Sequence, residues 1–141
     1  MREEDELHTI LAEWVEKAEA DLASAVRLLA EKEAWAAETI CFHAQQCVEK
    51  YLKTMLVLAR IDFPKTHDVR RLMGMLPSAS RPDLSQAERD TLTPYATVTR
   101  YPTGLGPLHI RQARQAVAMA RRVRKHARSV LPRPALRRRK R

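Results

Sequence analysis

The chain has 141 residues, enough for one domain with one hydrophobic core, and it is poor in aromatic residues (5%) and in glycine (three residues). This composition favours helices packed through aliphatic and alanine side chains over β-structure, which uses more aromatic and β-branched residues. No apolar run approaches the ~20 residues that span a bilayer, and the acidic start MREEDELH does not resemble a secretory signal, so we expect a soluble cytoplasmic protein.

Charge is divided unevenly along the chain, which carries a net charge of +9. All 17 acidic residues lie at or before Asp90, where 12 basic residues leave 12 − 17 = −5. From Thr91 onward there are 14 basic residues and no acidic ones, giving +14, and the chain ends in RRRKR. The asymmetry indicates either an anionic partner for the C-terminal third or a basic tail attached to the domain.

Two long helices are predicted first. The earlier one covers about residues 4–31, and its apolar stripe comprises Leu7, Leu11, Trp14, Ala18, Leu22, Ala25 and Leu29. The later one covers about residues 34–60, and its core face comprises Cys47, Val48, Tyr51, Leu52, Met55, Leu58 and Ala59. Because few residues connect the two helices, we expect them to pack antiparallel.

The middle of the chain predicts two short helices. Thr66 is expected to cap the first, and His67 beside it to hydrogen-bond locally. A loop with the sequence PSASRPD follows. Ser85 and Glu88 then form a capping-box pattern that opens the second short helix.

A fifth helix is predicted after the loop TRYPTGLGP, and Pro107 suits its first turn. One face carries small apolar residues: Ala113, Ala116, Ala120, Val123, Ala127 and Val130. The opposite face carries Arg111, Arg114, Arg121, Lys125 and Arg128. We predict that the helical domain spans residues 1–131 and that residues 132–141, which lack periodicity, form a disordered basic tail.

The two cysteines, Cys41 and Cys47, are six residues apart on the same predicted helix. That offset is ~9 Å of helical rise and directs the two thiols to different faces, so they cannot pair with each other. No second pair of ligands occurs at zinc-finger spacing. We therefore expect two buried or half-buried thiols, no metal site and no cofactor.

Three strings stand out: WVEKAEADLASAVRLL in the first helix, FHAQQCVEKYLKTMLVLA in the second, and KTHDVRRL after it. They resemble HEPN domains, small helical domains found in prokaryotic toxin–antitoxin modules and in some large eukaryotic proteins. The resemblance covers residues 6–131. It implies an all-α, up-and-down bundle of four to five helices that forms a homodimer. The extra apolar surface of the fifth helix, with its small alanines, points to the same dimer.

Polar residues of the second helix are the first candidates for a site. His43, Gln46, Glu49, Lys50 and Lys53 fall on other faces than the core residues. Three uses stay open. The first four could bond to a neighbouring helix, to the Arg100 loop or to a dimer mate; they could form a solvated face with a few weak salt bridges; or they could contact a nucleotide or RNA directly.

The loop sequence Arg100-Tyr101-Pro102 is the second candidate. An arginine offers a planar fork of donors that matches phosphate, and a tyrosine can stack on a base or donate its hydroxyl. Strings of this kind resemble one subset of HEPN proteins. The alternative is that Arg100 is an ordinary loop residue or pairs with a carboxylate of the second helix.

HEPN ribonucleases carry an arginine, four to six residues, and then a histidine near the start of the last helix. In that pattern the arginine would stabilise phosphate and the histidine would assist attack by the 2′-hydroxyl. Here Arg100 is followed by His109, but eight residues separate them. Arg121 with His126 and Arg60 with His67 have the required spacing, but the first pair lies inside the fifth helix and the second lies across the connection after the second helix. A looped-out insertion could still bring the two catalytic candidates, Arg100 and His109, together, so ribonuclease activity stays open.

The basic face of the fifth helix and the RRRKR tail could hold RNA or DNA through phosphate groups without reading sequence. The alternative is a solvated helix face and an incidental tail. We interpret the chain as a HEPN protein that binds nucleotide or RNA phosphate. The resemblance implies that it acts with a separate minimal nucleotidyltransferase, its antitoxin, as a toxin–antitoxin component. A metal-independent ribonuclease toxin and a purely structural interaction module are the alternatives.

Overall fold

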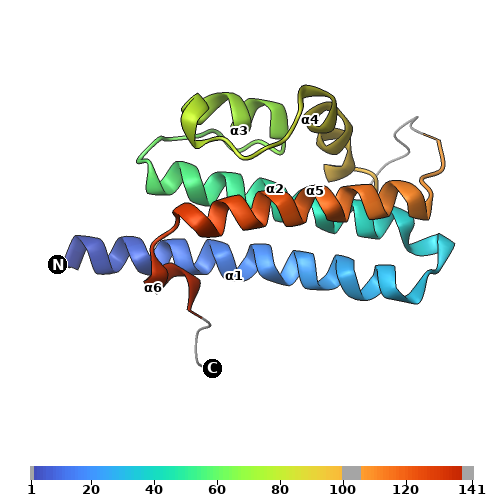
Figure 1. Ribbon diagram of the computed structural model, residues 1–141, viewed down its shortest axis with the longest axis horizontal. Helices are drawn as coiled ribbons and strands as arrows, with labels where there is room; N and C mark the ends of the chain where they lie inside the picture. The colour runs from blue at the N-terminus through green and yellow to red at the C-terminus, as the bar shows by residue number, and fades with distance from the viewer. Residues whose placement is uncertain (1, 100–105, 138–141) are drawn as a thin grey trace.

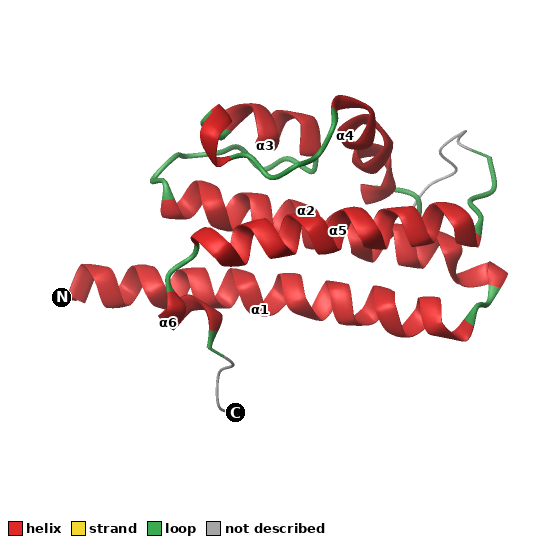
Figure 2. Cartoon of the chain, in the orientation of Figure 1, coloured by secondary structure: helices red, strands yellow, loops and turns green. Residues whose placement is uncertain are grey.

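The computed structural model describes residues 2–99 and 106–137, and within these ranges the chain is helical, with no β-strand (Figure 2). Three long helices lie side by side: α1 (Arg2–Glu31), α2 (Ala37–Leu58) and α5 (Ile110–Val130) (Figure 1). Two short helices, α3 (Val69–Met75) and α4 (Gln86–Leu92), cover one side of them, and α3 contacts α2. The all-α bundle predicted from the sequence is confirmed.

The three long helices do not all run in alternating directions. α1 and α2 are antiparallel, as expected, and are joined by the 3₁₀ turn η1 (Ala34–Ala36). The short helices α3 and α4 and the 3₁₀ turn η3 (Thr93–Ala96) return the chain to the end of the bundle where α2 began, and α5 begins at that end. α5 therefore runs in the same direction as α2.

α2 is the central helix because it contacts α1, α5, α3 and η3. Its apolar core is correspondingly wide: Ala37, Ile40, Cys41, Ala44, Cys47, Val48, Tyr51, Leu52, Met55 and Leu56 are all buried. Leu58 and Ala59, predicted to belong to this core, lie at the end of the helix, where Leu58 is half-buried and Ala59 is exposed. The two thiols are free and buried, as predicted, and burial raises the pKa of Cys41 to about 12.

The alanine stripe of α5 packs inside the protomer. Ala113, Ala116, Ala120 and Ala127 are fully buried, and α5 contacts α2 along its length, whereas Val130 is 45% exposed. Alanines let two backbones approach closely, and here the partner is α2. The alanine stripe is therefore no longer an argument for a dimer, and the homodimer stays a prediction.

Helix caps differ in part from the sequence expectation. The capping box of Ser85 and Glu88 is confirmed. The cap of α3 is Asp68, whose carboxylate accepts hydrogen bonds from two backbone N–H groups, and not Thr66, whose hydroxyl accepts from the Asp68 N–H. Pro107 lies before α5 and not in its first turn, because the N-cap of α5 is His109.

The expected disordered tail begins with a helix. α6 (Arg133–Leu136) packs against α1, and Ala135 is buried at 1% exposure. The prediction of disorder is therefore wrong for residues 132–137. The segment lacks periodicity, but the side chains of Ala135 and Leu136 pack against the core. Residues 138–141 of the predicted tail lie outside the described residues.

Candidate functional site

The first polar cluster joins α1 to α2. Asp21 is buried on α1, and its two oxygens contact His43 Nδ1 at 2.8 Å and Lys50 Nζ at 2.5 Å. A carboxylate only accepts hydrogen bonds, so His43 Nδ1 carries a proton. Burial acts to raise the pKa of Asp21, but the hydrogen bonds from His43 and Lys50 outweigh it and lower the pKa below 3.8. The pairing therefore holds Asp21 ionised.

The second polar cluster joins α2 to the segment before α3. Glu49 is buried on α2, with Oε1 2.8 Å from His67 Nδ1 and Oε2 3.0 Å from Lys53 Nζ. Gln45 Nε2 donates to both Glu49 Oε1 and the His67 carbonyl, each at 3.1 Å. Gln46 Nε2 donates to Gln45 Oε1 at 2.6 Å. Every polar side chain of this set has a partner within the chain.

The third polar cluster joins α1 to α5. Glu19 accepts from Arg124 Nε at 2.8 Å, from Arg124 Nη2 at 2.9 Å and from the Tyr51 hydroxyl at 2.6 Å. Arg128 Nη1 lies 3.7 Å from the same carboxylate. Burial acts to raise the pKa of Glu19, but the hydrogen bonds from Arg124 and Tyr51 outweigh it and lower the pKa below 4.5.

All three strings that carried the family resemblance meet in these clusters, and the first of them, WVEKAEADLASAVRLL, supplies Glu19 and Asp21. The string HAQQCVEK supplies His43, Gln45, Gln46, Glu49 and Lys50, and the string KTHD supplies His67. Because their polar atoms pair with one another around the buried carboxylates of Asp21 and Glu49, the strings fix how α2 sits against α1 and against the α2–α3 segment.

His43, Gln46 and Lys50, predicted to bind nucleotide or RNA, therefore have intramolecular partners. Their side chains are half-buried, with His43 at 27% and Lys50 at 23% exposure. Of the uses left open, bonding to a neighbouring helix is observed for His43 and Lys50. Direct contact with a ligand stays a prediction. Asp21 was missed as their partner, although it lies at helical spacing between Ala18 and Ala25, a core position.

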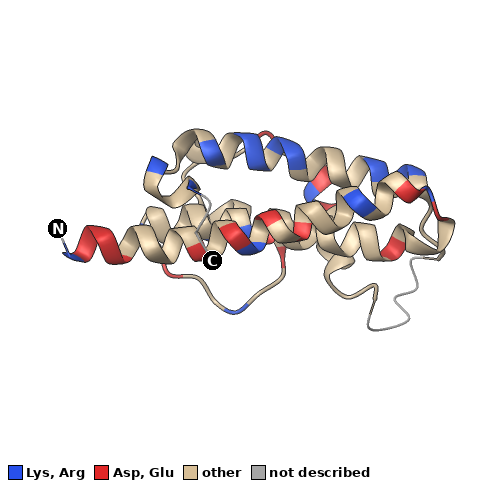
Figure 3. Cartoon of the chain, turned by 90° about the horizontal axis from the view of Figure 1, so that it is seen from below, with Lys and Arg blue, Asp and Glu red and all other residues tan. Residues whose placement is uncertain are grey.

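The basic residues of α5, which lie along the helix in Figure 3, divide into two groups according to their ion pairs. Arg122 pairs with Glu88 of α4, Arg124 pairs with Glu19 of α1, and Arg128 also approaches Glu19. The second group is exposed and, among the described residues, has no carboxylate within ion-pair distance; it comprises Arg111, Arg114, Arg121 and Lys125. We call this second group the basic stripe. Of the five α5 residues predicted to bind the phosphate backbone of a nucleic acid, four belong to the basic stripe and Arg128 does not.

Of the candidates Arg100, Tyr101 and His109, the structure describes only His109. Arg100 and Tyr101 lie outside the described residues, so their predicted roles stay predictions. His109 is the exposed N-cap of α5, and its backbone N–H donates to Gln112 Oε1 at 2.6 Å. Its pairing with Arg100 in a ribonuclease site also stays a prediction.

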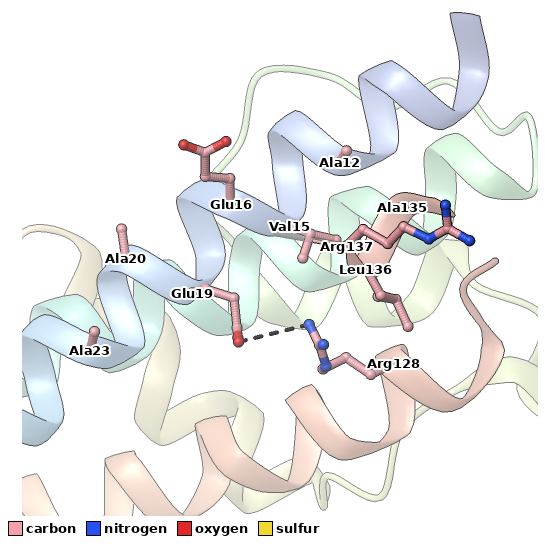
Figure 4. A pocket seen from close by; sticks show the side chains of 10 residues that line it. All are labelled: Ala12, Val15, Glu16, Glu19, Ala20, Ala23, Arg128, Ala135, Leu136 and Arg137. Carbon is pink, nitrogen blue, oxygen red and sulfur yellow. Dashed lines mark ion pairs between the residues drawn. The ribbon is translucent and has the colours of Figure 1, made fainter. Parts of the chain in front are cut away.

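An open groove of about 700 Å³ runs beside α1, where α6 and the end of α5 approach it (Figure 4). Four small residues face it, Ala12, Ala20, Ala23 and Ala135, and the rest of its lining comprises Val15, Glu16, Glu19, Arg128, Leu136 and Arg137. The ion pair of Glu19 and Arg128 crosses one side of it. Of the residues predicted to bind a ligand, it contains only Arg128.

Two further searches cover only the described part of the chain. There, no group of three or more His, Cys, Asp or Glu side chains could hold a metal ion. No helix in the same part is long and apolar enough to cross a membrane.

The helical bundle with its polar clusters defines a small HEPN-like module. A family model of the HEPN domain matches residues 11–130, and the chain belongs to the HEPN domain family. None of the curated proteins compared with the chain matches it.

Two crystal structures share the fold. TT1696 from Thermus thermophilus is 27% identical with a TM-score of 0.68, and the match covers 86% of this chain and 98% of that one. ST0689, an archaeal HEPN homologue, is 23% identical with a TM-score of 0.65, covering 84% of this chain and 95% of that one.

Proposed function

We propose that this HEPN-domain protein binds phosphate groups of a nucleotide or of RNA, and that it acts in the cytoplasm with a separate minimal nucleotidyltransferase as one component of a toxin–antitoxin pair. The observation that carries the phosphate-binding part is the basic stripe. Its four cations are exposed on one helix, and no described carboxylate neutralises them.

The contrast within α5 supports phosphate binding. Arg122 and Arg124 are the basic residues that the fold uses, because each is bound to a carboxylate of another helix. The residues of the basic stripe form no ion pair with a described carboxylate, yet they place four positive charges on one helix. Clustered cations without counter-ions create a positive potential that attracts phosphate and releases its condensed counterions.

The nucleotidyltransferase partner is supported by the family and not by the geometry of the site. In this proposal the Tyr101 hydroxyl oxygen attacks the α-phosphate of a nucleoside triphosphate held by the partner enzyme. An O–P bond forms, pyrophosphate leaves, and the phenolic proton goes to solvent. The protein acts as a homodimer in this proposal, as HEPN proteins of this type are expected to do.

Phosphate binding is tested with a paired variant. Arg114→Gln/Arg121→Gln removes two stripe charges, and Lys17→Gln/Arg27→Gln removes two charges of α1 as the matched control. We expect the first variant to weaken binding of a labelled single-stranded RNA and to lower its log–log salt slope by about 1.4, at roughly 0.7 per lost contact. The control should bind as the native chain does. Equal loss in both variants would mean that net charge alone, and not the stripe, drives binding.

The partnership is tested separately. The reading frame beside the gene should encode a small nucleotidyltransferase, and co-incubation with that enzyme and a nucleoside triphosphate should add one or more nucleotidyl masses to the chain. The Tyr101→Phe variant should gain no mass at that position. Mass gained equally by Tyr101→Phe would place the acceptor elsewhere, and no mass gain in either would reject the transfer.

A further inference from the structure

The basic stripe has a spacing that no single phosphate group requires. Arg111 and Arg114 are three residues apart, and Arg121 and Lys125 are four apart, so each pair sits on adjacent turns of one helix face. Along the axis the pairs are ~4.5 Å and ~6 Å long and are separated by ~10 Å, at 1.5 Å per residue. The stripe therefore consists of two cation pairs that together span ~21 Å.

Ion pairs flank the Arg121 and Lys125 pair on both sides. Arg122 with Glu88 of α4 lies on one side, and Arg124 with Glu19 of α1 lies on the other. A phosphate chain that crossed α5 steeply at this pair would run on to these arginines and their carboxylates. A chain that follows the helix axis meets free cations only. Figure 3 shows the basic residues as a row along α5.

α5 holds this spacing rigidly. It is helical without interruption from Ile110 to Val130, and its buried alanines pack on α2. The distance between the two cation pairs is therefore set by backbone geometry and not by loop conformation. A stacked strand has one phosphate per ~3.4 Å, so ~21 Å corresponds to about six phosphates.

From this spacing we propose that α5 binds a polynucleotide strand lying along its axis, with both cation pairs engaged by one strand of about six nucleotides. The proposal rests on the phosphate binding proposed above and narrows it, because a mononucleotide can occupy only one pair. The contacts are to phosphates, so RNA and DNA strands of any sequence fit.

The experiment compares two ligand lengths across three variants of the full chain. Arg111→Gln/Arg114→Gln removes one pair, Arg121→Gln/Lys125→Gln removes the other, and the third variant combines all four changes. ATP and a labelled hexanucleotide, in RNA and DNA forms, are the probes. Lys17→Gln/Arg27→Gln is the control, and circular dichroism checks that each variant is folded.

For the hexanucleotide, each pair variant should lower the salt slope by about 1.4 relative to the native chain, and the combined variant by about 2.8. The differences cancel any constant contribution from the rest of the chain. For ATP, removing either pair leaves the other as a comparable site, so affinity should fall by no more than about twofold. The combined variant should lose ATP binding.

Three outcomes would overturn the proposal. The first is that only one of the two pair variants weakens binding of the hexanucleotide. The second is that each pair variant lowers the affinity for ATP as much as it lowers the affinity for the hexanucleotide. Either would leave phosphate binding intact but reject the strand along α5. If all four changes leave the binding of both probes unchanged, the proposed phosphate-binding function fails as well.

Discussion

Glu49→Leu should be among the most damaging single substitutions in this protein. The change removes a carboxylate that is 5% exposed and strands the Lys53 ammonium, 3.0 Å away on a side chain that is 10% exposed. Leaving one member of a buried ion pair uncompensated costs roughly 3–5 kcal/mol. The free energy of unfolding of a domain of this size is about 5–15 kcal/mol, so Glu49→Leu should remove a large part of it.

The double variant Glu49→Leu/Lys53→Met separates this mechanism from simple loss of packing. It removes both charges, and replacing a buried ion pair by apolar side chains is often neutral. The remaining members of the cluster stay satisfied. Gln45 keeps the His67 carbonyl and Gln46 as partners, and the His67 side chain is 59% exposed to water. We therefore expect the double variant to lie within about 1 kcal/mol of the native chain, and so to be about 2–4 kcal/mol more stable than Glu49→Leu.

Urea denaturation followed by far-UV circular dichroism measures the loss of unfolding free energy in Glu49→Leu and in the double variant. Gln46→Ala is a useful comparison, because this half-buried residue lies at the edge of the same cluster and should cost only about 1 kcal/mol. The reasoning is refuted if Glu49→Leu costs less than about 1 kcal/mol, or if the double variant is no more stable than the single one.

Three other predictions concern stability and reactivity. Glu19 and Asp21 have pKa values lowered below 4.5 and 3.8, so their stabilisation is complete above those values and is lost as pH falls through the lower folded-state values. Glu19→Gln should therefore be less stable than the native chain near pH 7, and the difference should shrink as the pH falls below 4.5; a constant difference in urea denaturation would contradict this. Lys32 and Arg60 end helices with φ of 56° and 58°, a region that favours glycine, so Lys32→Gly and Arg60→Gly should each raise stability by about 0.5–1 kcal/mol, seen as a higher Tm; a lower Tm would show that these side chains contribute contacts. Burial raises the pKa of the Cys41 and Cys47 thiols, so both should resist Ellman's reagent in the native protein and react after unfolding, whereas rapid reaction of either in the native protein would contradict its burial.

Periodicity predicted the long helices because their apolar residues repeat every three or four positions. It located the stripe of α1 well, although Trp14 is only half-buried, against Phe63, and Val15 takes the buried position. It could not predict that α2 is covered on several sides, since that depends on where α3 and η3 fold back. Buried polar residues such as Glu49 follow from this coverage, and no local pattern marks them.

The candidate site was predictable to a different degree in each region. Arg111, Arg114, Arg121 and Lys125 were identified from spacing alone, because exposed charge on a helix follows directly from its period. Their separation from the three arginines bound in ion pairs was not predictable, because it requires knowing that Glu19 and Glu88 approach α5 from helices distant in sequence. α6 was missed because a four-residue helix is too short to show a period.

The polar contacts of α1 have a consequence for how the long helices can move. Alanine-rich surfaces are smooth, and on their own they would let one helix slip along another by a turn, ~5.4 Å, at little cost in packing. Glu19 ties α1 to α5, and Asp21, two residues further on, ties it to α2. A slip of α1 in either direction would break both attachments at once and leave the buried Asp21 carboxylate unpaired. The two carboxylates thus set the axial register of the whole bundle, and they leave its small residues free to make the packing close.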